Sequence, residues 1–172
     1  MIRIGEPATT LDTPIEHLMA CHRRIEDRLT SLERAACLLR ESPDAAAHAI
    51  HAAIGFLDSN GVMHTADEEL SLFPRLRPRL SETERAYVDS LEHQHREAEL
   101  VYEELKAIVA RLAQVSDEDA QALRELAGRL RGLYLKHIRS EDAILTALAR
   151  RSLDPHDLTA IATEMKGRRR KV

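Results

Sequence analysis

The sequence predicts an all-α protein, an up-down-up-down antiparallel four-helix bundle with a short C-terminal fifth helix. Apolar residues recur at spacings of three and four along four segments, each far longer than the usual helix of about 12 residues. Capping residues, proline or glycine bound these segments, and no segment alternates as a β-strand does. The connections are short, so consecutive helices should pack antiparallel.

The first helix is expected to begin at a capping box, Thr13 to Glu16, with Pro14 in the first helical position. It should end near Arg40. The second helix is expected from about Asp44 to Phe73, where prolines follow. The stripe of the first helix is Ile15, Leu18, His22, Ile25, Leu29, Leu32, Ala36 and Leu39. That of the second helix is Ala47, Ile50, Ile54, Leu57, Gly61, His64, Glu68 and Leu72.

The third helix is expected to begin at a second capping box, Ser81 to Glu84, and the fourth after Ser116. A short fifth helix should follow Asp154 and end at Gly167. The stripe of the third helix is Val88, Leu91, His95, Ala98, Tyr102, Leu105, Val109 and Leu112. That of the fourth helix is Leu123, Leu130, Leu133, His137, Glu141, Ile144 and Leu148. We expect one domain over 1–172, with a bundle core at about 12–150 and the short helix and a basic tail at 151–172.

Composition narrows the class of protein. Hydrophobic residues make up 44% and charged residues 31% of 172 residues, which disfavours disorder, and no apolar run reaches the ~20 residues that a membrane helix needs. The net charge of −4 argues against nucleic acid as a partner, and the basic run 168–171 is expected to be a solvated tail. Residues 1–7 lack the apolar stretch of a signal peptide, so we expect a cytoplasmic location, with Cys21 and Cys37 as free thiols.

Each apolar stripe is interrupted once by histidine: His22, His64, His95 and His137. We count residues from each histidine to the end of its helix, and from the start of the next helix to the next histidine. The two counts match across every loop: about 18 and 20 at the first, about 11 and 13 at the second, and about 18 and 20 at the third. In an antiparallel bundle these matched distances place all four imidazoles at one level. One buried histidine is usually a core residue with a single hydrogen bond, but four at one level indicate a site.

Carboxylates accompany these histidines. Glu68 and Glu141 each follow a stripe histidine by four residues, so each pair projects from one helix face. Buried glutamates need a counter-charge, which a metal cation supplies. Glu26 and Glu99 have the same spacing from His22 and His95 but stand at the stripe margin, where they either coordinate or face solvent.

Other polar residues are weaker candidates. His93 is two positions from His95 and therefore lies on another face. Glu69 points about 100° away from its neighbour, which suits solvent or a supporting position around the ligands. Tyr102 and Tyr134 are expected as core aromatic residues near the site. The remaining histidines, His17, His48, His51 and His156, have no matching partner.

The two segments 64–74 and 137–145 resemble the repeated HxxxE signature of hemerythrin-like HHE cation-binding domains, and His22 and His95 match the remaining family histidines. The resemblance covers about residues 12–150. It implies an oxo- or hydroxo-bridged centre of two iron ions, for which manganese or zinc could substitute. It further implies that both irons share the two glutamates, with His22 and His64 on one iron and His95 and His137 on the other.

The sequence departs from the oxygen-carrying hemerythrins at Glu99, where those proteins have a second histidine. Coordination by carboxylate in place of imidazole would favour ferric iron and disfavour simple oxygen carriage. The resemblance therefore implies a centre that binds or reacts with O2, peroxide or NO, and possible enzyme activity that consumes peroxide or NO. The alternatives are a non-catalytic iron- or oxygen-sensing regulator and a plain structural bundle. The sequence leaves the physiological ligand, redox partner and oligomeric state open.

Overall fold

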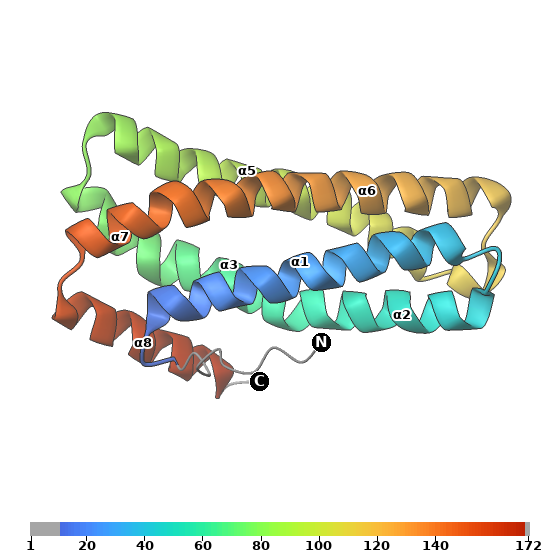
Figure 1. The fold of residues 1–172 in the computed structure, drawn as a ribbon, viewed down its shortest axis with the longest axis horizontal. Helices are drawn as coiled ribbons and strands as arrows, with labels where there is room; N and C mark the ends of the chain where they lie inside the picture. Colours follow the sequence, from blue (N-terminus) through green and yellow to red (C-terminus); the bar gives the residue numbers. More distant parts are fainter. Residues whose placement is uncertain (1–10, 171–172) are drawn as a thin grey trace, which may run out of the picture.

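Four long helical segments run alternately up and down the molecule, and a fifth helix lies at one end of the bundle (Figure 1). This computed structural model describes residues 11–170. The first segment is α1 (Pro14–Leu38), and the third is α5 (Glu82–Val109), followed by the 3-10 turn η4 (Leu112–Gln114). Both are regular α-helices throughout. The expected bundle with a short C-terminal helix is confirmed.

The second and fourth segments contain π turns. The second consists of α2 (Pro43–Phe56), the π turn η1 (Leu57–Gly61), α3 (Val62–Asp67), the π turn η2 (Glu68–Leu72), α4 (Phe73–Leu76) and the 3-10 turn η3 (Arg77–Arg79). The fourth consists of α6 (Asp117–Ser140), the π turn η5 (Glu141–Leu145) and α7 (Thr146–Ser152). The fifth helix is α8 (Pro155–Arg169). A π turn inserts one residue into a helix, and such insertions are frequent at functional sites.

The helix starts agree with the expected caps except at α1. Ser81 and Glu84 form the expected capping box, and Asp154 and Asp157 form another at the start of α8. The capping box expected at Thr13 is wrong, because Thr13 makes no side-chain cap hydrogen bond. A residue before proline is kept out of the helical region, and the proline itself starts the helix.

Two helix ends lie beyond their expected positions. The second segment passes through Pro74 to Leu76 instead of ending at Phe73. The π turn η2 precedes Pro74 directly and changes the backbone hydrogen-bond register, which makes the missing N–H of proline tolerable there. The last helix passes Gly167 and ends at Arg169, since arginines in its last turn bind the bundle.

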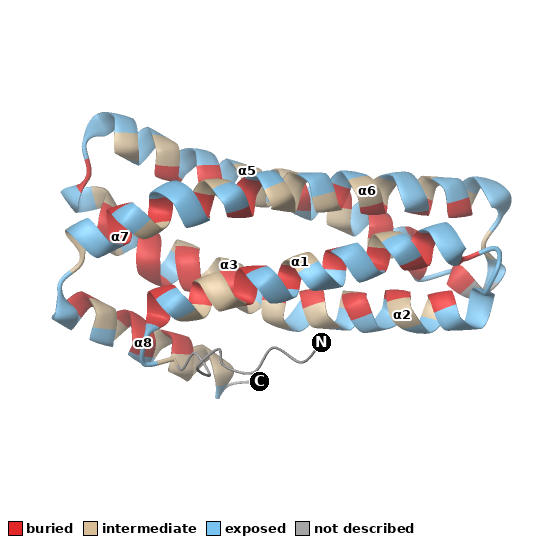
Figure 2. Cartoon of the chain, in the orientation of Figure 1, coloured by how far each residue is buried: buried red, intermediate tan, exposed pale blue. Residues whose placement is uncertain are grey.

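The core consists of two apolar clusters separated by a polar layer. Figure 2 marks the buried positions in red along the long helices. One cluster fills the half of the bundle around Leu29, Leu105 and Leu123, and the other lies under α8 around Phe73 and Ile161. On every long segment the stripe histidine falls between residues of the two clusters. The helix α1 packs against α2 and α6, and α5 packs against α6 and α2, which closes the bundle around this layer.

The expected stripe of the fourth segment is wrong at one position. Ile144 is 45% exposed, and Leu145 is buried in its place, because the π turn η5 shifts the inward face by one residue. Within residues 11–170, no helix combines the length and apolar character that crossing a bilayer requires. Residues 1–7 and Lys171, on which the sequence interpretation partly relied, lie outside the described residues.

Candidate metal centre

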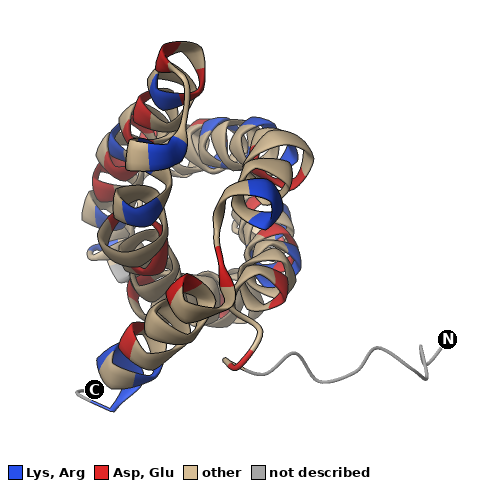
Figure 3. Ribbon diagram, turned by 90° about the vertical axis from the view of Figure 1, so that its left-hand side faces the viewer, with Lys and Arg blue, Asp and Glu red and all other residues tan. Residues whose placement is uncertain are grey.

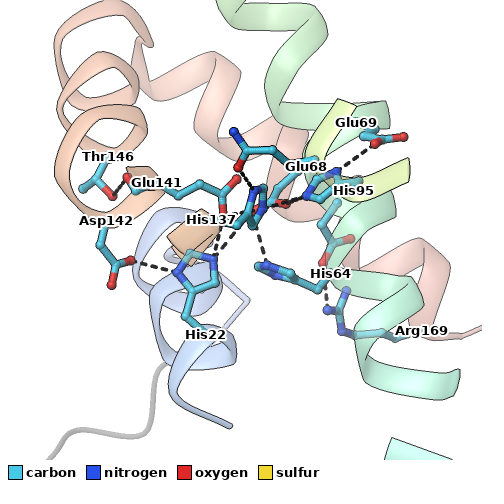
Figure 4. Close-up of polar contacts among 12 residues, drawn as sticks. His22, His64, Glu68, Glu69, His95, His137, Glu141, Asp142, Thr146 and Arg169 are labelled. Atoms are coloured by element: carbon cyan, nitrogen blue, oxygen red, sulfur yellow. Dashed lines mark hydrogen bonds and ion pairs between the residues drawn. The ribbon is translucent and has the colours of Figure 1, made fainter. Parts of the chain in front are cut away.

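One buried layer brings together six of the eight candidate ligands, drawn from all four long segments (Figure 4). They are His22 from α1, His64 from α3, Glu68 from η2, His95 from α5, His137 from α6 and Glu141 from η5. Glu68 is fully buried and Glu141 is 1% exposed. The expectation that chain distances place the four histidines at one level therefore agrees with the structure.

The six side chains form two groups that share both carboxylates. In the first group, His22 Nε2 lies 3.2 Å from Glu141 Oε2 and 3.7 Å from Glu68 Oε1. His64 Nε2 lies 3.4 Å from the same Glu68 oxygen. The ligand atoms of this group all lie within 4.8 Å of one another, a spacing that one metal ion can bridge.

The second group mirrors the first across the carboxylates. His95 Nε2 lies 3.4 Å from Glu68 Oε2, and His137 Nε2 lies 3.2 Å from Glu141 Oε2. The two Nε2 atoms of these histidines are 2.9 Å apart. The atoms of this group also lie within 4.8 Å of one another. Each group thus offers two imidazoles and two shared carboxylates, an arrangement suited to two adjacent cations.

Three of the imidazoles are oriented by polar partners on Nδ1. These partners are Asp142 for His22 at 2.8 Å, Glu69 for His95 at 2.8 Å and Gln94 for His137 at 3.1 Å. When Nδ1–H donates to such an oxygen, the lone pair of Nε2 faces the centre, which is the tautomer that a metal requires. The fourth imidazole, His64, has a buried Nδ1 without a hydrogen-bond partner.

The carboxylates of Glu68 and Glu141 are the strongest evidence that the layer binds a cation. Both oxygens of Glu68 and both oxygens of Glu141 are buried and accept no hydrogen bond. His22 Nε2 is likewise buried without a hydrogen bond. An ionised carboxylate in this state loses hydration worth several kcal/mol unless positive charge lies beside it. Divalent cations bound by oxygen and imidazole nitrogen would satisfy all five atoms, so the residues present fit a metal centre.

The pKa values reflect the same demand for positive charge. Burial alone would lower the pKa of His22, but its contacts with Asp142, Glu141 and Glu68 raise it to about 12. Burial also opposes protonation of His95, yet the carboxylates raise its pKa to about 9. Burial alone would raise the pKa of Glu68 and of Glu141, but the facing histidines hold both below the usual value. The carboxylates therefore stay anionic, and the layer attracts cations.

The two marginal carboxylates lie outside both groups. Glu26 on α1 is half-buried, and Glu99 on α5 is exposed. Glu99 instead lines a cavity of about 360 Å³ that reaches His95 and Glu69 from the surface between α3 and α5. His93 is exposed, in agreement with the preference for His95.

The two tyrosines near the site have different partners. Tyr134 lines the same cavity as His95, and burial together with Glu68 and Glu141 raises its pKa to about 12. Tyr102 also lines this cavity, and its hydroxyl donates to Asp58 at 2.9 Å.

Sequence reasoning missed Asp142 and Gln94. One signal for Asp142 is present in the chain, because each HxxxE motif continues with a second acidic residue, Glu69 or Asp142. Each of these residues binds the histidine of a neighbouring regular helix, so the two motifs use the extra carboxylate in the same way. Gln94 has no comparable pattern and is found only from the structure.

Comparison with known protein families identifies the domain that contains this layer. The hemerythrin HHE cation-binding domain model matches residues 13–149, which is well over half of the chain and includes every residue of the layer. No curated protein matches the chain significantly. The chain belongs to the hemerythrin family of HHE cation-binding domains.

Proposed function

We propose that this protein is a non-haem di-iron protein whose centre binds or reacts with a small molecule, namely O2, peroxide or NO. The observation that carries the proposal is the sharing of two buried, unsatisfied carboxylates by two pairs of histidines. His22 and His64 would hold one iron, His95 and His137 the other, and Glu68 and Glu141 would contribute to both. The bound irons would supply redox chemistry and an open coordination position.

The donor set favours iron over a structural zinc ion. Structural zinc sites prefer four ligands, often cysteine, in a closed tetrahedron, whereas mixed imidazole and carboxylate ligands suit iron or manganese. Glu26 and Glu99 stand outside the ligand groups, so ferric preference cannot rest on their coordination. It rests instead on Asp142 and Glu69, because carboxylates bound to Nδ1 make the imidazoles stronger donors.

The space beside the centre supports a very small ligand. A cavity of about 10 Å³, room for roughly one water molecule, lies against His22, Glu68 and Glu141. Its other walls are mostly apolar, including Leu18 and Leu145. This volume admits at most a very small ligand. The larger cavity at His95 offers a route from the surface.

Metal content and the optical spectrum after anaerobic ferrous loading and brief exposure to air would test the proposal. We expect about two irons per chain, set by the two ligand groups, and near-ultraviolet charge-transfer bands. His64→Ala should lose both signals while remaining helical. An intact helical fold that takes up no iron would refute the di-iron assignment.

A second experiment separates reaction from sensing. Rapid consumption of peroxide or NO by the loaded protein would support a reactive centre. A loaded protein that leaves both unchanged would instead favour the alternative, a non-catalytic iron- or oxygen-sensing regulator.

A further inference from the structure

The C-terminal helix α8 contacts the bundle directly behind the metal layer. It packs against α3, η2 and α1 (Figure 1), and Figure 3 shows basic residues in blue at its C-terminal end. The match to the family ends at residue 149, whereas α8 spans Pro155–Arg169. The residues that α8 contributes to these contacts therefore lie beyond the matched range.

The residue at the centre of these contacts is Asp67, which directly precedes the candidate ligand Glu68. Asp67 is fully buried. Arg168 Nε donates to its Oδ1 at 2.7 Å, and Arg169 Nη2 donates to its Oδ2 at 2.8 Å. Arg168 and Arg169, two of the residues expected to form a solvated tail, are thus half-buried partners of a buried carboxylate, which needs compensating charge. Arg170 is exposed, as expected. Figure 4 shows Arg169 beneath the layer.

The network extends one turn along the same face. Arg168 Nη2 donates to Ser71 Oγ at 2.6 Å, and that hydroxyl donates to Glu164 of α8 at 2.5 Å. Arg75 closes the network through Glu164 Oε1 at 2.7 Å. Both ends of the π turn η2 are therefore bound to α8 on the outer side.

Glu68 is the first residue of this turn and points to the other side, into the metal layer. Consecutive helical residues diverge by about 100°, so Asp67 and Glu68 face α8 and the centre respectively. A shift of Asp67 would move the backbone that carries Glu68, whose oxygens face His64 and His95.

We propose that Asp67, clamped by Arg168 and Arg169 of α8, positions Glu68 in the metal centre, so that docking of α8 and binding of metal strengthen each other. This inference rests on the metal centre proposed above. Thermodynamic coupling is reciprocal: if docked α8 raises metal affinity, bound metal must raise the protection of α8 by the same factor. Each direction can be measured separately.

The variants are Asp67→Asn and the double variant Arg168→Ala/Arg169→Ala. Arg170→Ala is the control, because it removes one arginine at the same end of α8 whose side chain is exposed. Ferrous affinity is measured anaerobically by competition with a chelator. We expect losses of roughly 10- to 100-fold for both variants, as for residues that orient ligands, and no change for the control.

Three readouts separate positioning from general stabilisation. The visible spectrum of Co²⁺ bound in place of iron should shift in both variants, because the ligand geometry at Glu68 changes. The variant Arg168→Ala/Arg169→Lys should keep part of the affinity that Arg168→Ala/Arg169→Ala loses, because it retains a cation beside Asp67. Hydrogen exchange of peptides covering 155–170 should slow on Fe²⁺ binding in the wild type and the control but not in the double variant.

Unchanged affinity and Co²⁺ spectrum in both variants would refute the coupling while leaving the metal centre intact. Equal hydrogen-exchange rates of α8 with and without Fe²⁺ in the wild type would also refute the coupling. A wild-type protein that binds neither Fe²⁺ nor Co²⁺ would refute the proposed function and this inference together.

Discussion

The regular helices α1 and α5 and the two segments with π turns carry the same His-x-x-x-Glu spacing, yet they use it differently. On α1 and α5 the residue three after the histidine, Ile25 or Ala98, is buried, while the glutamate four after it lies at the margin or in solvent. On the other two segments the residue four after the histidine, Glu68 or Glu141, is buried. Spacing alone therefore does not decide which glutamate reaches the centre.

The difference follows from helix geometry. Buried residues recur in steps of four at His64, Glu68, Leu72 and Leu76 in the second segment, and at His137, Glu141, Leu145 and Ala149 in the fourth. Successive steps of four exceed the 3.6 residues of an α-helical turn, so a regular helix would drift by about 40° at each step. The π turns η2 and η5 begin at the two glutamates and absorb this drift. The inserted residue keeps both the carboxylate and the following apolar residues inward.

The largest expected effect separates the inner from the outer carboxylates. Glu68→Gln and Glu141→Gln should each lose at least one of the two irons and weaken binding by about 100-fold or more, beyond the range for supporting residues. Glu26→Gln and Glu99→Gln should keep the wild-type stoichiometry, because neither belongs to a ligand group. Metal analysis after ferrous loading measures all four. Loss of iron in Glu99→Gln would show that this carboxylate moves inward on loading.

The next largest effect tests the shift caused by η5. Leu145→Ala should destabilise the metal-free protein by about 2–5 kcal/mol, as expected for a buried leucine. Ile144→Ala should cost less than about 1 kcal/mol, because Ile144 is 45% exposed. Urea denaturation followed by circular dichroism measures both. A regular α-helix would reverse the ranking, so a larger cost at Ile144 would contradict the π turn.

The sequence predicted the level of the site because helical rise is constant and the loops are short. Matched chain distances therefore placed four histidines together without any knowledge of the π turns. Those turns were not predicted, because the stripes were assigned with a period of three and four throughout, which put Ile144 inside in place of Leu145. The role of Asp67 was out of reach for another reason: its partners Arg168 and Arg169 are distant in sequence, and only tertiary packing brings them together.

A smaller effect tests whether the π-turn motifs support the regular helices symmetrically. Glu69 from η2 binds His95 of α5, and Asp142 from η5 binds His22 of α1. Glu69→Gln and Asp142→Asn should each weaken iron binding by about 10-fold, because the imidazole loses a charged acceptor on Nδ1. Chelator competition measures this effect, with exposed Glu104→Gln on α5 as the control. An effect in only one of the two variants would show that the two motifs are not equivalent.

The smallest effect concerns pH and distinguishes the two π turns from each other. In η2, Ser71 is held by Glu164 of α8, whose pKa lies below its usual value because Arg75 binds it. A carboxyl group with a depressed folded pKa stabilises the fold at neutral pH, and this contribution is lost as the pH falls through the folded value. Acidification below about pH 4.3, the ordinary glutamate value, should therefore loosen η2 before η5.

Hydrogen exchange at residues 68–73 and 141–146 of the metal-free protein, corrected for intrinsic rates, can follow this loosening from pH 6 to pH 3. Glu68 and Glu141 occupy the same position in their turns, but their neighbours lower their pKa values to different extents, so the comparison with Glu164→Gln isolates the contribution of α8. Glu164→Gln should expose η2 already at pH 6 and remove most of the difference in pH response. If η2 and η5 loosen together in the wild type, the bracing of η2 by Glu164 contributes nothing measurable, and the π turns are equivalent in stability as well as in geometry.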